Sequence, residues 1–505
     1  MGNIRNRYFD IAPGIFFPAA FITLVFVVFT ITYNQLAEQT FSSFQTAISS
    51  HFGWFIAACI NYYLVFVIIL AFTRLGTIRI GGRDAKPDFN KFSWIAMLFS
   101  AGMGIGLVYF SVAEPMLNFA HPVSTSFSPD EKAAEAMKNT FFHYGLHVWG
   151  IYILLGIALA YFTFNKNSPL SIRSLLAPLL GNSMYRWPGH LIEVIAVLAT
   201  LFGLATSLGF GAVQFSTGVS LTTGIDNTQT LQILSIAVIT LIATGSVVSG
   251  LNKGLKLLSN FNIVIALVLF TVILLAGSTT RLLTDFATSV GRYAGGLAQL
   301  SGSLVSSSDS GQWFKGWSLF YWAWWISWSP FVGTFIARIS KGRTIREIAI
   351  YGLLLPSVFS FLWMAVLGGT ALEMQLDGSV DLAGVVSADS SKGLFAMLDH
   401  LPFAGLTSLM SILLVATFFI TSSDSGSLVV DYMTSGGKLD APVVQKVFWA
   451  FMEGTIAIAL LVGGGLAALQ SASISTGLPF AVILTLVSIS LVKALKKDEQ
   501  LNAST

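Results

Sequence analysis

The chain has 505 residues, of which 54% are hydrophobic and only 10% are charged, and its formal net charge is +3. Soluble globular proteins usually carry about 25% charged residues, so this composition excludes a soluble protein and indicates an integral membrane protein. The single cysteine, Cys59, excludes a disulfide framework and a thiolate metal cluster.

Apolar runs of about 20 residues recur along the chain, and each is long enough to cross a bilayer as a helix. They predict an all-α integral membrane protein rather than a β-barrel. The polar N-terminal segment with Arg5 and Arg7 leads into an apolar run that is too long for a cleavable signal, so this run is expected to be the first span. Run length predicts about twelve spans, at residues 13–33, 53–75, 91–114, 139–165, 189–218, 232–250, 257–278, 316–338, 347–372, 401–430, 444–463 and 473–494.

Basic residues are distributed unevenly over the loops that these spans define. All but six of the 27 Lys and Arg residues fall in loops on one side. The opposite loops hold the remaining six, Lys132, Lys138, Arg281, Arg292, Lys315 and Lys392. Because loops rich in Lys and Arg stay in the cytoplasm, both termini are predicted to be cytoplasmic, and the protein is expected in the inner (plasma) membrane of the cell.

The third predicted span contains the sequence SAGMGIG from Ser100 to Gly106. Glycines at alternate positions weaken a membrane helix and free backbone groups for other partners. Gly-x-Gly runs also occur in nucleotide-binding loops, but no strand precedes this one. Two interpretations remain: a close helix–helix contact through small residues, or an unwound segment that binds an ion or a substrate.

The fourth predicted span opens with aromatic residues and two histidines. His143 and His147 are spaced to supply half of a metal site, but no third ligand accompanies them, so a metal site is not predicted. Tyr144, Trp149 and Tyr152 lie within an arc of about 140° on a helix, which makes them candidate walls of a cage for a cation. Ordinary core or interface aromatics are the alternative for each of them.

The segment 279–315 is expected to be an external loop. Its mixture of apolar and polar residues predicts a helix that lies on the outer surface rather than crossing the membrane.

The span that follows is rich in tryptophan. Tyr321, Trp324, Trp325 and Trp328 fall at i, i+3, i+4 and i+7 and so share one helix face, whereas Trp322 points elsewhere. An aromatic belt at the membrane interface is one interpretation. The other is a stacked indole face for a desolvated cation, which is attracted to the ring quadrupole.

Helix interruptions at corresponding places organise the two halves of the chain. Spans three to seven and eight to twelve can form two five-helix repeats of inverted topology, whose first members are the Gly-rich span and the Trp-rich span. We expect glycines to interrupt the first and Ser329-Pro330 to interrupt the second, a pattern that points to the midplane site of a secondary transporter. The predicted organisation is a cytoplasmic tail (1–12), two peripheral helices (13–75), repeat one (91–278), the external loop (279–315), repeat two (316–494) and a second cytoplasmic tail (495–505).

Span ten ends in a polar run from Thr421 to Ser427. Polar and ionisable residues inside a membrane are costly unless they bind something. Hydroxyl and carbonyl oxygens suit a monovalent cation such as Na⁺. The alternative is a set of interhelical hydrogen bonds together with a helix end.

Four of these segments carry a resemblance to a known family. The sequence FYWAWWISWSPFVGTFIARIS from Phe320 to Ser340, followed by KGRTIRE, closely resembles the signature of the betaine/choline/carnitine transporter family. Gly102 to Gly106, Phe142 to Trp149 and Thr421-Ser422 match it in order, so that the resemblance extends from Pro13 to Lys496. It implies a LeuT-like core of two inverted five-helix repeats, alternating access and usually a homotrimer.

Carried over by position, the resemblance implies a box for a quaternary ammonium group. Tyr144 stands where many members have another tryptophan, which softens one wall. The implied substrate-binding residues are Trp324, Trp325, Trp328, Trp149, Tyr152 and Tyr144, with Gly102, Met103, Gly104 and Gly106 of the Gly-rich span.

The resemblance also implies Na⁺ as the coupling ion and no other cofactor. The family's sodium site maps onto backbone oxygens of Ser100, Met103 and Phe418 and the hydroxyls of Thr421 and Ser422. A second sodium site is less complete, because Thr200 and Phe331 are retained but Leu204 stands where a second hydroxyl is expected.

The expected function is Na⁺ symport of a methylated zwitterion such as glycine betaine. Gly106 favours a zwitterion over choline, because proton-coupled choline carriers of the family tend to have an acid at this position. The alternatives are an H⁺-coupled carrier of choline, carnitine or a sulfonium analogue such as dimethylsulfoniopropionate, and a sensor that does not transport. No nucleophile elbow, Walker loop or zincin motif is present, so neither an enzyme nor a nucleic-acid partner is expected.

Overall fold

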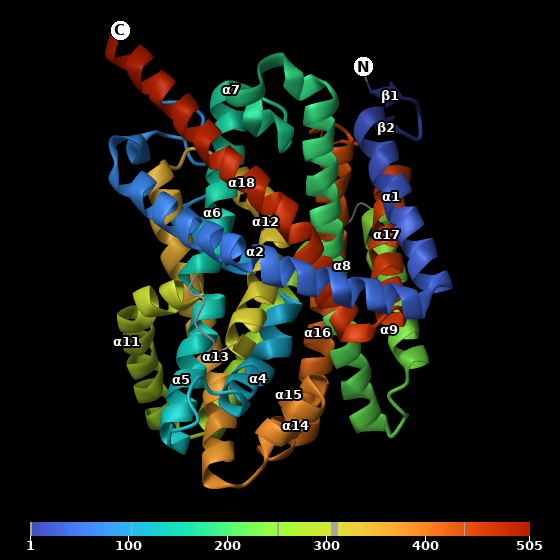
Figure 1. Ribbon diagram of the computed structural model, residues 1–505, viewed down its shortest axis with the longest axis vertical. Coiled ribbons are helices and arrows are strands. Elements are labelled where there is room, and N and C mark those ends of the chain that lie inside the picture. Colours follow the sequence, from blue (N-terminus) through green and yellow to red (C-terminus); the bar gives the residue numbers. More distant parts are fainter. Residues whose placement is uncertain (1–2, 103, 250–251, 305–311, 439, 505) are drawn as a thin grey trace.

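The computed structural model describes residues 3–102, 104–249, 252–304, 312–438 and 440–504. The described chain is helical almost throughout (Figure 1), after a short antiparallel hairpin of β1 (Ile4–Arg5) and β2 (Asp10–Ile11). The helices of the first half are α1 (Pro13–Thr32), α2 (Asn34–Phe72), η1 (Arg74–Thr77), α3 (Lys91–Gly102), α4 (Ile105–Ala120), α5 (Pro129–Tyr144), α6 (Leu146–Lys166), η2 (Arg173–Leu176), α7 (Ala177–Leu180), η3 (Gly181–Tyr185), α8 (Trp187–Thr223), α9 (Gln229–Ser249) and α10 (Asn252–Ala276). Those of the second half are α11 (Thr279–Ser303), α12 (Gln312–Ile339), α13 (Ile345–Asp377), α14 (Leu382–Ala388), η4 (Ser390–Lys392), α15 (Gly393–Asp399), α16 (Ala404–Thr434), α17 (Val443–Val462) and α18 (Gly465–Ser504).

Ten helical segments in the described part of the chain are long and apolar enough to cross a membrane. The two other predicted spans, the Gly-rich and the Trp-rich one, form α3 with α4 and α12. The fold is therefore an all-α membrane protein, as predicted. The count of about twelve spans and the inverted repeats stay predictions.

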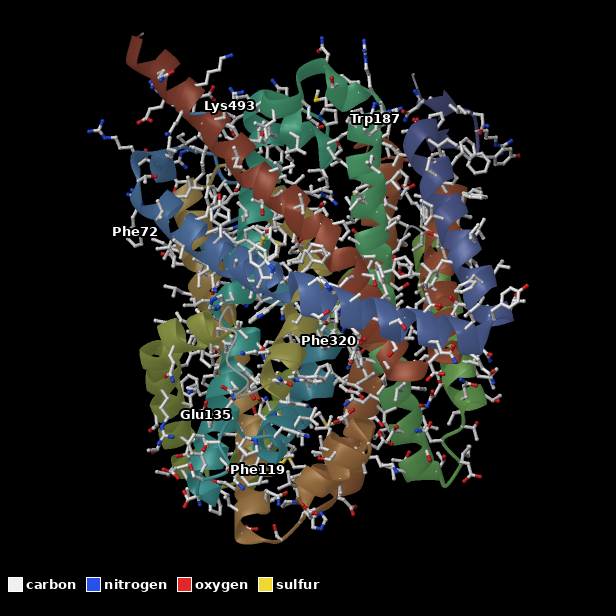
Figure 2. The ribbon with its side chains drawn as sticks, viewed as in Figure 1. Phe72, Phe119, Glu135, Trp187, Phe320 and Lys493 are labelled. Atoms are coloured by element: carbon white, nitrogen blue, oxygen red, sulfur yellow. The ribbon has the colours of Figure 1, made fainter. Side chains whose placement is uncertain are left out.

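Apolar side chains lie both inside the bundle and on its surface. Figure 2 shows Phe320 in the interior, where it is 1% exposed, and Phe72 and Trp187 at the periphery, where they are 74% and 73% exposed. In α1 the exposed Phe17 and Phe21 are one helical turn apart and form part of a continuous apolar stripe. Such a surface is unstable in water but suits a bilayer.

Two long helices cross the face of the bundle that Figure 1 presents. α2 runs obliquely across it, and α18 crosses it diagonally toward the C-terminus. The predicted span 53–75 corresponds only to the second part of α2, because the helix already begins at Asn34. α12 packs against α6, α8 and α18 and so lies at the centre of the molecule.

Glycines interrupt two of the inner helices. α3 ends at Gly102 and α4 begins at Ile105, with the backbone of Gly104 fully extended (φ −158°, ψ −176°). This confirms the predicted interruption of the Gly-rich span. A second break was not predicted: Gly145 (φ −100°, ψ −142°) separates α5 from α6, so the fourth span is not one continuous helix.

The predicted interruption at Ser329-Pro330 is wrong, because α12 continues through both residues. Pro330 has no N–H and therefore leaves the carbonyl of Ile326 without its helical donor. The Ser329 hydroxyl donates to that carbonyl at 2.6 Å and replaces the lost bond. Ser329 therefore supplies the hydrogen bond that Pro330 cannot make, and the helix stays continuous.

The predicted helix of the external loop is present as α11. Its buried side chains, Leu282, Ser289, Tyr293 and Leu300, follow one another along a single helix face, and most of its other residues are exposed or half-buried. This pattern is typical of a helix that lies against the surface of a bundle.

The N-terminal hairpin is fastened to the C-terminal end of α16. Both oxygens of the Asp10 carboxylate accept from Lys438 Nζ at 2.7 Å, and Oδ1 also accepts from Asn3 Nδ2 at 2.7 Å. The backbone N–H of Ala12 donates to the carbonyl of Thr434 at 2.8 Å. Burial alone raises the pKa of the Asp10 carboxyl, but the bonds from Lys438 and Asn3 outweigh burial and leave the pKa below its usual value.

We expect Asp10→Asn to loosen this hairpin. A carboxyl whose folded pKa is depressed stabilises the folded state above its unfolded pKa of about 3.9, and this stabilisation is lost as the pH falls through the folded pKa. Backbone hydrogen exchange over residues 3–12 is therefore expected to be faster in the variant at pH 7 and to converge with the wild type at strongly acidic pH. Asp84→Asn, at an exposed carboxylate, is the control. Equal exchange in wild type and Asp10→Asn at pH 7 would contradict the prediction.

Candidate substrate and ion site

The Trp-rich face of α12 lies inside the bundle. Tyr321 and Trp324 are 0% exposed, and Trp325 and Trp328 are 7% and 6% exposed, so these residues do not form an interfacial belt. Trp322 points away from this face, as predicted, and its ring packs on other side chains of α5 and α6. The helical spacing in the sequence therefore identified the residues that share the inner face.

Hydrogen bonds to backbone carbonyls fix the three indoles at their edges. Trp328 Nε1 donates to the Gly203 carbonyl of α8 at 2.9 Å, and Trp324 Nε1 donates to the same carbonyl at 3.3 Å. Trp325 Nε1 donates to the carbonyl of His143 at 3.0 Å. The rings of Trp324 and Trp325 are stacked, with centroids 4.6 Å apart and planes at 12°. Because the N–H groups are occupied, the π faces are the surfaces that remain for a ligand.

The side chains of α5 and α6 complete an aromatic site, which we call the aromatic box. Its cavity of about 30 Å³ holds roughly two waters, which makes the box a contracted one. It is lined by Gly104, Gly106, Leu107, Tyr144, Val148, Trp149, Tyr152, Trp324, Trp325, Trp328 and Ser360. Eight of the ten predicted substrate-binding residues therefore come together. Of the other two, Gly102 ends α3 and Met103 lies outside the described residues.

The glycines of the break let the backbone approach the indoles. A Cβ atom on Gly106 would lie 2.7 Å from the Trp324 ring, and one on Gly104 would lie 3.3 Å from the Trp328 ring. A side chain at position 106 would therefore displace a wall of the aromatic box. This contact explains why the Gly-rich break and the Trp-rich face occur together.

A second, larger cavity adjoins the box and shares one wall with it. Its volume is about 380 Å³, and it extends between α10, α12, α13 and α16. Trp328 lines both cavities and separates them. We call the larger one the vestibule. Its lining residues are Ser259, Asn262, Ile263, Ala266, Leu267, Phe270, Trp328, Phe331, Val332, Phe335, Phe359, Trp363, Phe418, Thr421, Ser422 and Ser425.

Three of the five residues predicted for the main sodium site lie together in the vestibule wall: Phe418, Thr421 and Ser422. The Thr421 hydroxyl donates within its own helix, at 3.0 Å to the Thr417 carbonyl and 3.2 Å to that of Phe418. Its oxygen keeps lone pairs for a further partner. Ser100 belongs to α3, but its side chain, like the whole of Met103, lies outside what the structure describes.

The predicted second sodium site is not assembled to the same degree. The Thr200 hydroxyl donates to the Ala196 carbonyl of its own helix at 2.8 Å, and Phe331 lies in the vestibule wall. Leu204 is buried and faces Gly426, where a Cβ atom would lie 2.4 Å from Leu204 Cδ1. An apolar side chain thus occupies the place where a hydroxyl was expected.

Sequence reasoning missed two polar features near these cavities. Asn262 of α10 is 2% exposed, its Nδ2 lies 3.5 Å from the Thr421 hydroxyl, and its Oδ1 has no hydrogen-bond partner among the described residues. Amide side chains at Asn260 and Asn262 within a mostly apolar span were the signal that could have identified it. The second feature is a buried Glu114–His143 pair. His143 thus pairs with the Glu114 carboxylate across two helices.

The chain is similar to known proteins over almost its whole length. A model of the betaine/carnitine/choline family of transporters matches residues 14–500. A glycine betaine/proline/choline transporter of Vibrio parahaemolyticus is 44% identical, over 99% of this chain and 92% of that protein. Glycine betaine transporter 1 of the same organism is also 44% identical, over 99% and 96%. The glycine betaine transporter OpuD of Bacillus subtilis is 39% identical, over 96% and 95%.

Proposed function

Because the chain belongs to the betaine/carnitine/choline family of transporters, we propose that it imports a methylated zwitterion such as glycine betaine together with Na⁺. It is a multi-pass membrane protein and a transporter rather than an enzyme. Family membership confirms the resemblance found in the sequence. Glycine betaine as substrate, Na⁺ as coupling ion and alternating access as mechanism are proposed here.

The aromatic box is the observation that carries the proposal. A quaternary ammonium group donates no hydrogen bond, so it is bound through dispersion and through attraction to aromatic faces. The box offers such faces from α5, α6 and α12, while the indole N–H groups point outward to backbone carbonyls. Two of the relatives are named as glycine betaine transporters, and glycine betaine contains a quaternary ammonium group of this kind.

The carboxylate of a zwitterion requires a separate partner. Gly104 and Gly106 line the box at the start of α4, and the first N–H groups of a helix have no partner within the helix and attract anions. The first turn of α4 starts at Ile105, so its N-terminal dipole faces the box. We propose that the carboxylate lies there, which matches the absence of an acid at position 106.

The oxygen-lined wall of the vestibule supports Na⁺ as the coupling ion. The residues Phe418, Thr421, Ser422 and Asn262 line the vestibule together, and Asn262 Oδ1 has no hydrogen-bond partner among the described residues. Such oxygens suit Na⁺, and an ion there would connect α3 to α16. The incomplete second site, with Leu204 in place of a hydroxyl, favours one strongly bound Na⁺ over two.

Two cavities separated by Trp328 support alternating access. The vestibule lies between the parts of α10 and α12 that approach Lys256 and Arg338, which the charge distribution assigns to the cytoplasmic side. We propose that the substrate passes from the box into the vestibule and then to the cytoplasm. As in the resemblance, we expect a homotrimer in the plasma membrane.

Uptake into proteoliposomes tests the proposal. Imposed Na⁺, H⁺ and K⁺ gradients are compared with labelled glycine betaine, and choline, carnitine and dimethylsulfoniopropionate are added as competitors. We expect concentrative uptake with the Na⁺ gradient only and the strongest competition from methylated zwitterions. Uptake that needs a pH gradient and persists without Na⁺ would instead assign an H⁺-coupled carrier, and absence of any flux would point to a sensor.

A further inference from the structure

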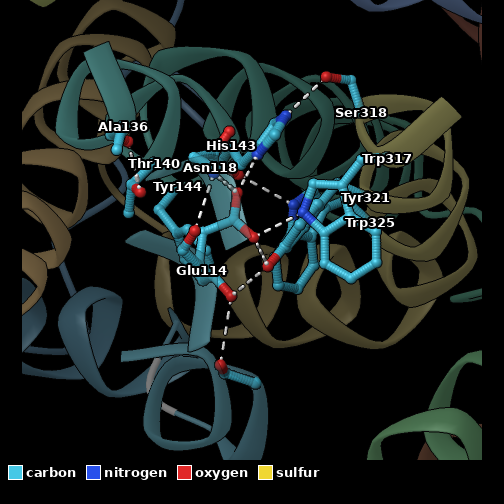
Figure 3. Close-up of polar contacts among 11 residues, drawn as sticks. Glu114, Asn118, Ala136, Thr140, His143, Tyr144, Trp317, Ser318, Tyr321 and Trp325 are labelled. Atoms are coloured by element: carbon cyan, nitrogen blue, oxygen red, sulfur yellow. Dashed lines mark hydrogen bonds and ion pairs between the residues drawn. The ribbon is translucent and has the colours of Figure 1, made fainter. Parts of the chain in front are cut away.

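The side chain of Glu114 in α4 is fully buried, yet it is saturated with hydrogen-bond donors (Figure 3). Its Oε1 accepts from Asn118 Nδ2 at 2.8 Å and from His143 Nδ1 at 2.6 Å. Its Oε2 accepts from Trp317 Nε1 at 2.7 Å and from Tyr321 Oη at 2.9 Å. A carboxylate offers about four lone-pair positions, so these four donors occupy all of them.

His143 of α5 uses both ring nitrogens in the same network. Because a carboxylate only accepts, Nδ1 carries a hydrogen and donates it to Glu114. Nε2 pairs with the Ser318 hydroxyl of α12 at 2.7 Å. The imidazole is also stacked on the Tyr321 ring, with centroids 4.6 Å apart and planes at 13°. These contacts join α4, α5 and α12 at one buried point.

Two short paths lead from this point to the aromatic box. Along the first, Tyr321 donates its only hydroxyl hydrogen to Glu114, so its oxygen is left to accept from Tyr144 Oη at 3.2 Å; Tyr144 Oη also lies 3.2 Å from the Gly106 carbonyl. Along the second, the carbonyl of His143 accepts from Trp325 Nε1 at 3.0 Å. Tyr144 and Trp325 both line the box, as does Gly106.

We infer that Glu114 and His143 are positioning residues that hold the Tyr144 and Trp325 walls of the aromatic box in the orientation that receives the substrate. Neither residue belongs to the box lining, so both act through Tyr321, Tyr144 and Trp325. The inference rests on the proposed function for the identity of the site. Its physical basis is that hydrogen bonds to a buried charged group are stronger than neutral ones, and that losing one partner leaves the others unpaired.

Glu114→Gln tests the carboxylate. The glutamine amide retains one acceptor oxygen and replaces the other with a donor, so two of the four donors lose their acceptor. We expect the KM for uptake to rise about tenfold, which corresponds to ~1.4 kcal/mol, with Vmax little changed. A substitution that harms only folding would instead lower Vmax through the amount of active protein and leave KM unchanged.

A pair of His143 variants separates the two ring nitrogens. The amide of asparagine reaches the position of Nδ1 and can still donate to Glu114, whereas that of glutamine reaches the position of Nε2 and Ser318. We expect His143→Asn to retain an affinity near that of the wild type and His143→Gln to raise KM as Glu114→Gln does. Thr140→Val is the matched control in α5, because the Thr140 hydroxyl donates only to the Ala136 carbonyl of its own helix.

The measurement uses full-length protein in proteoliposomes and whichever of glycine betaine or choline the wild type transports, with melting temperatures recorded for every variant. Raised KM in Glu114→Gln and His143→Gln, with recovery in His143→Asn, supports the positioning role. The inference is overturned if Glu114→Gln and His143→Gln fold and have the same KM as Thr140→Val. It is also overturned if His143→Gln has as low a KM as His143→Asn. A wild type that needs no Na⁺ would correct the proposed function but leave this comparison of KM values valid.

Discussion

Trp328→Leu is expected to weaken substrate binding about 5- to 30-fold, equivalent to ~1–2 kcal/mol for a desolvated cation. Leucine keeps an apolar side chain at the position but removes the ring quadrupole that attracts the ammonium group. It also removes the N–H that donates to the Gly203 carbonyl, so that carbonyl loses one of its two indole partners. Because Trp328 separates the box from the vestibule, the smaller side chain is further expected to open a passage between them.

Trp449→Leu is the matched control for this substitution. It removes the same ring from a fully buried position in α17, where the indole packs against Phe16 and Phe448 and lines neither cavity. We expect it to lower the melting temperature, since it leaves a cavity in the core, without changing substrate affinity. Trp328→Phe should fall between wild type and Trp328→Leu, because phenylalanine retains a weaker quadrupole. Affinity is measured by following tryptophan fluorescence as substrate is added. Wild-type affinity in Trp328→Leu would show that Trp328 contributes only to packing.

The aromatic site was predictable because its signal is local in the sequence. Helical spacing places Tyr321, Trp324, Trp325 and Trp328 on one face, and three alternating glycines weaken a membrane helix wherever they occur. Both features follow from covalent geometry within about ten residues. The structure accordingly shows one indole face and one break at Gly104.

Features that depend on contacts distant in the sequence were not predictable in the same way. Glu114 and His143 are 29 residues apart, and Ser318 is a further 175 residues from His143. From the sequence alone, His143 could be considered only as half of a metal site, because its hydrogen-bond partner Glu114 lies on another helix. The opposite error occurred at Pro330, where a local rule predicted a break and one neighbouring hydroxyl, that of Ser329, prevented it.

The sodium prediction lies between these cases. Resemblance carried over Phe418, Thr421 and Ser422, and the structure places all three in one vestibule wall. It did not carry over Asn262, whose amide approaches Thr421 from α10. A buried amide oxygen without a partner is costly in an apolar span, so a ligand there would offset that cost. Asn262 therefore strengthens the argument that this wall binds a cation.

Thr421→Ala is expected to raise the Na⁺ concentration for half-maximal uptake about tenfold, or ~1.4 kcal/mol, because it removes one of the oxygens proposed to bind Na⁺ and the partner of Asn262 Nδ2. Substrate affinity at saturating Na⁺ should stay near the wild-type value, since the aromatic box is untouched. At low Na⁺ the apparent affinity for substrate should fall as well, because the effects of two coupled ligands on each other's binding are reciprocal.

Thr417→Ala provides the control one helical turn away. Its hydroxyl also donates within α16, to the Leu413 carbonyl at 2.7 Å, but Thr417 does not line the vestibule. We expect its Na⁺ dependence to match the wild type. Initial uptake rates are measured over a range of Na⁺ at fixed and at saturating substrate, with ionic strength held constant. An unchanged Na⁺ requirement in Thr421→Ala would show that Na⁺ does not bind at this wall. A loss of substrate affinity that saturating Na⁺ does not restore would indicate that Thr421 contacts the substrate instead.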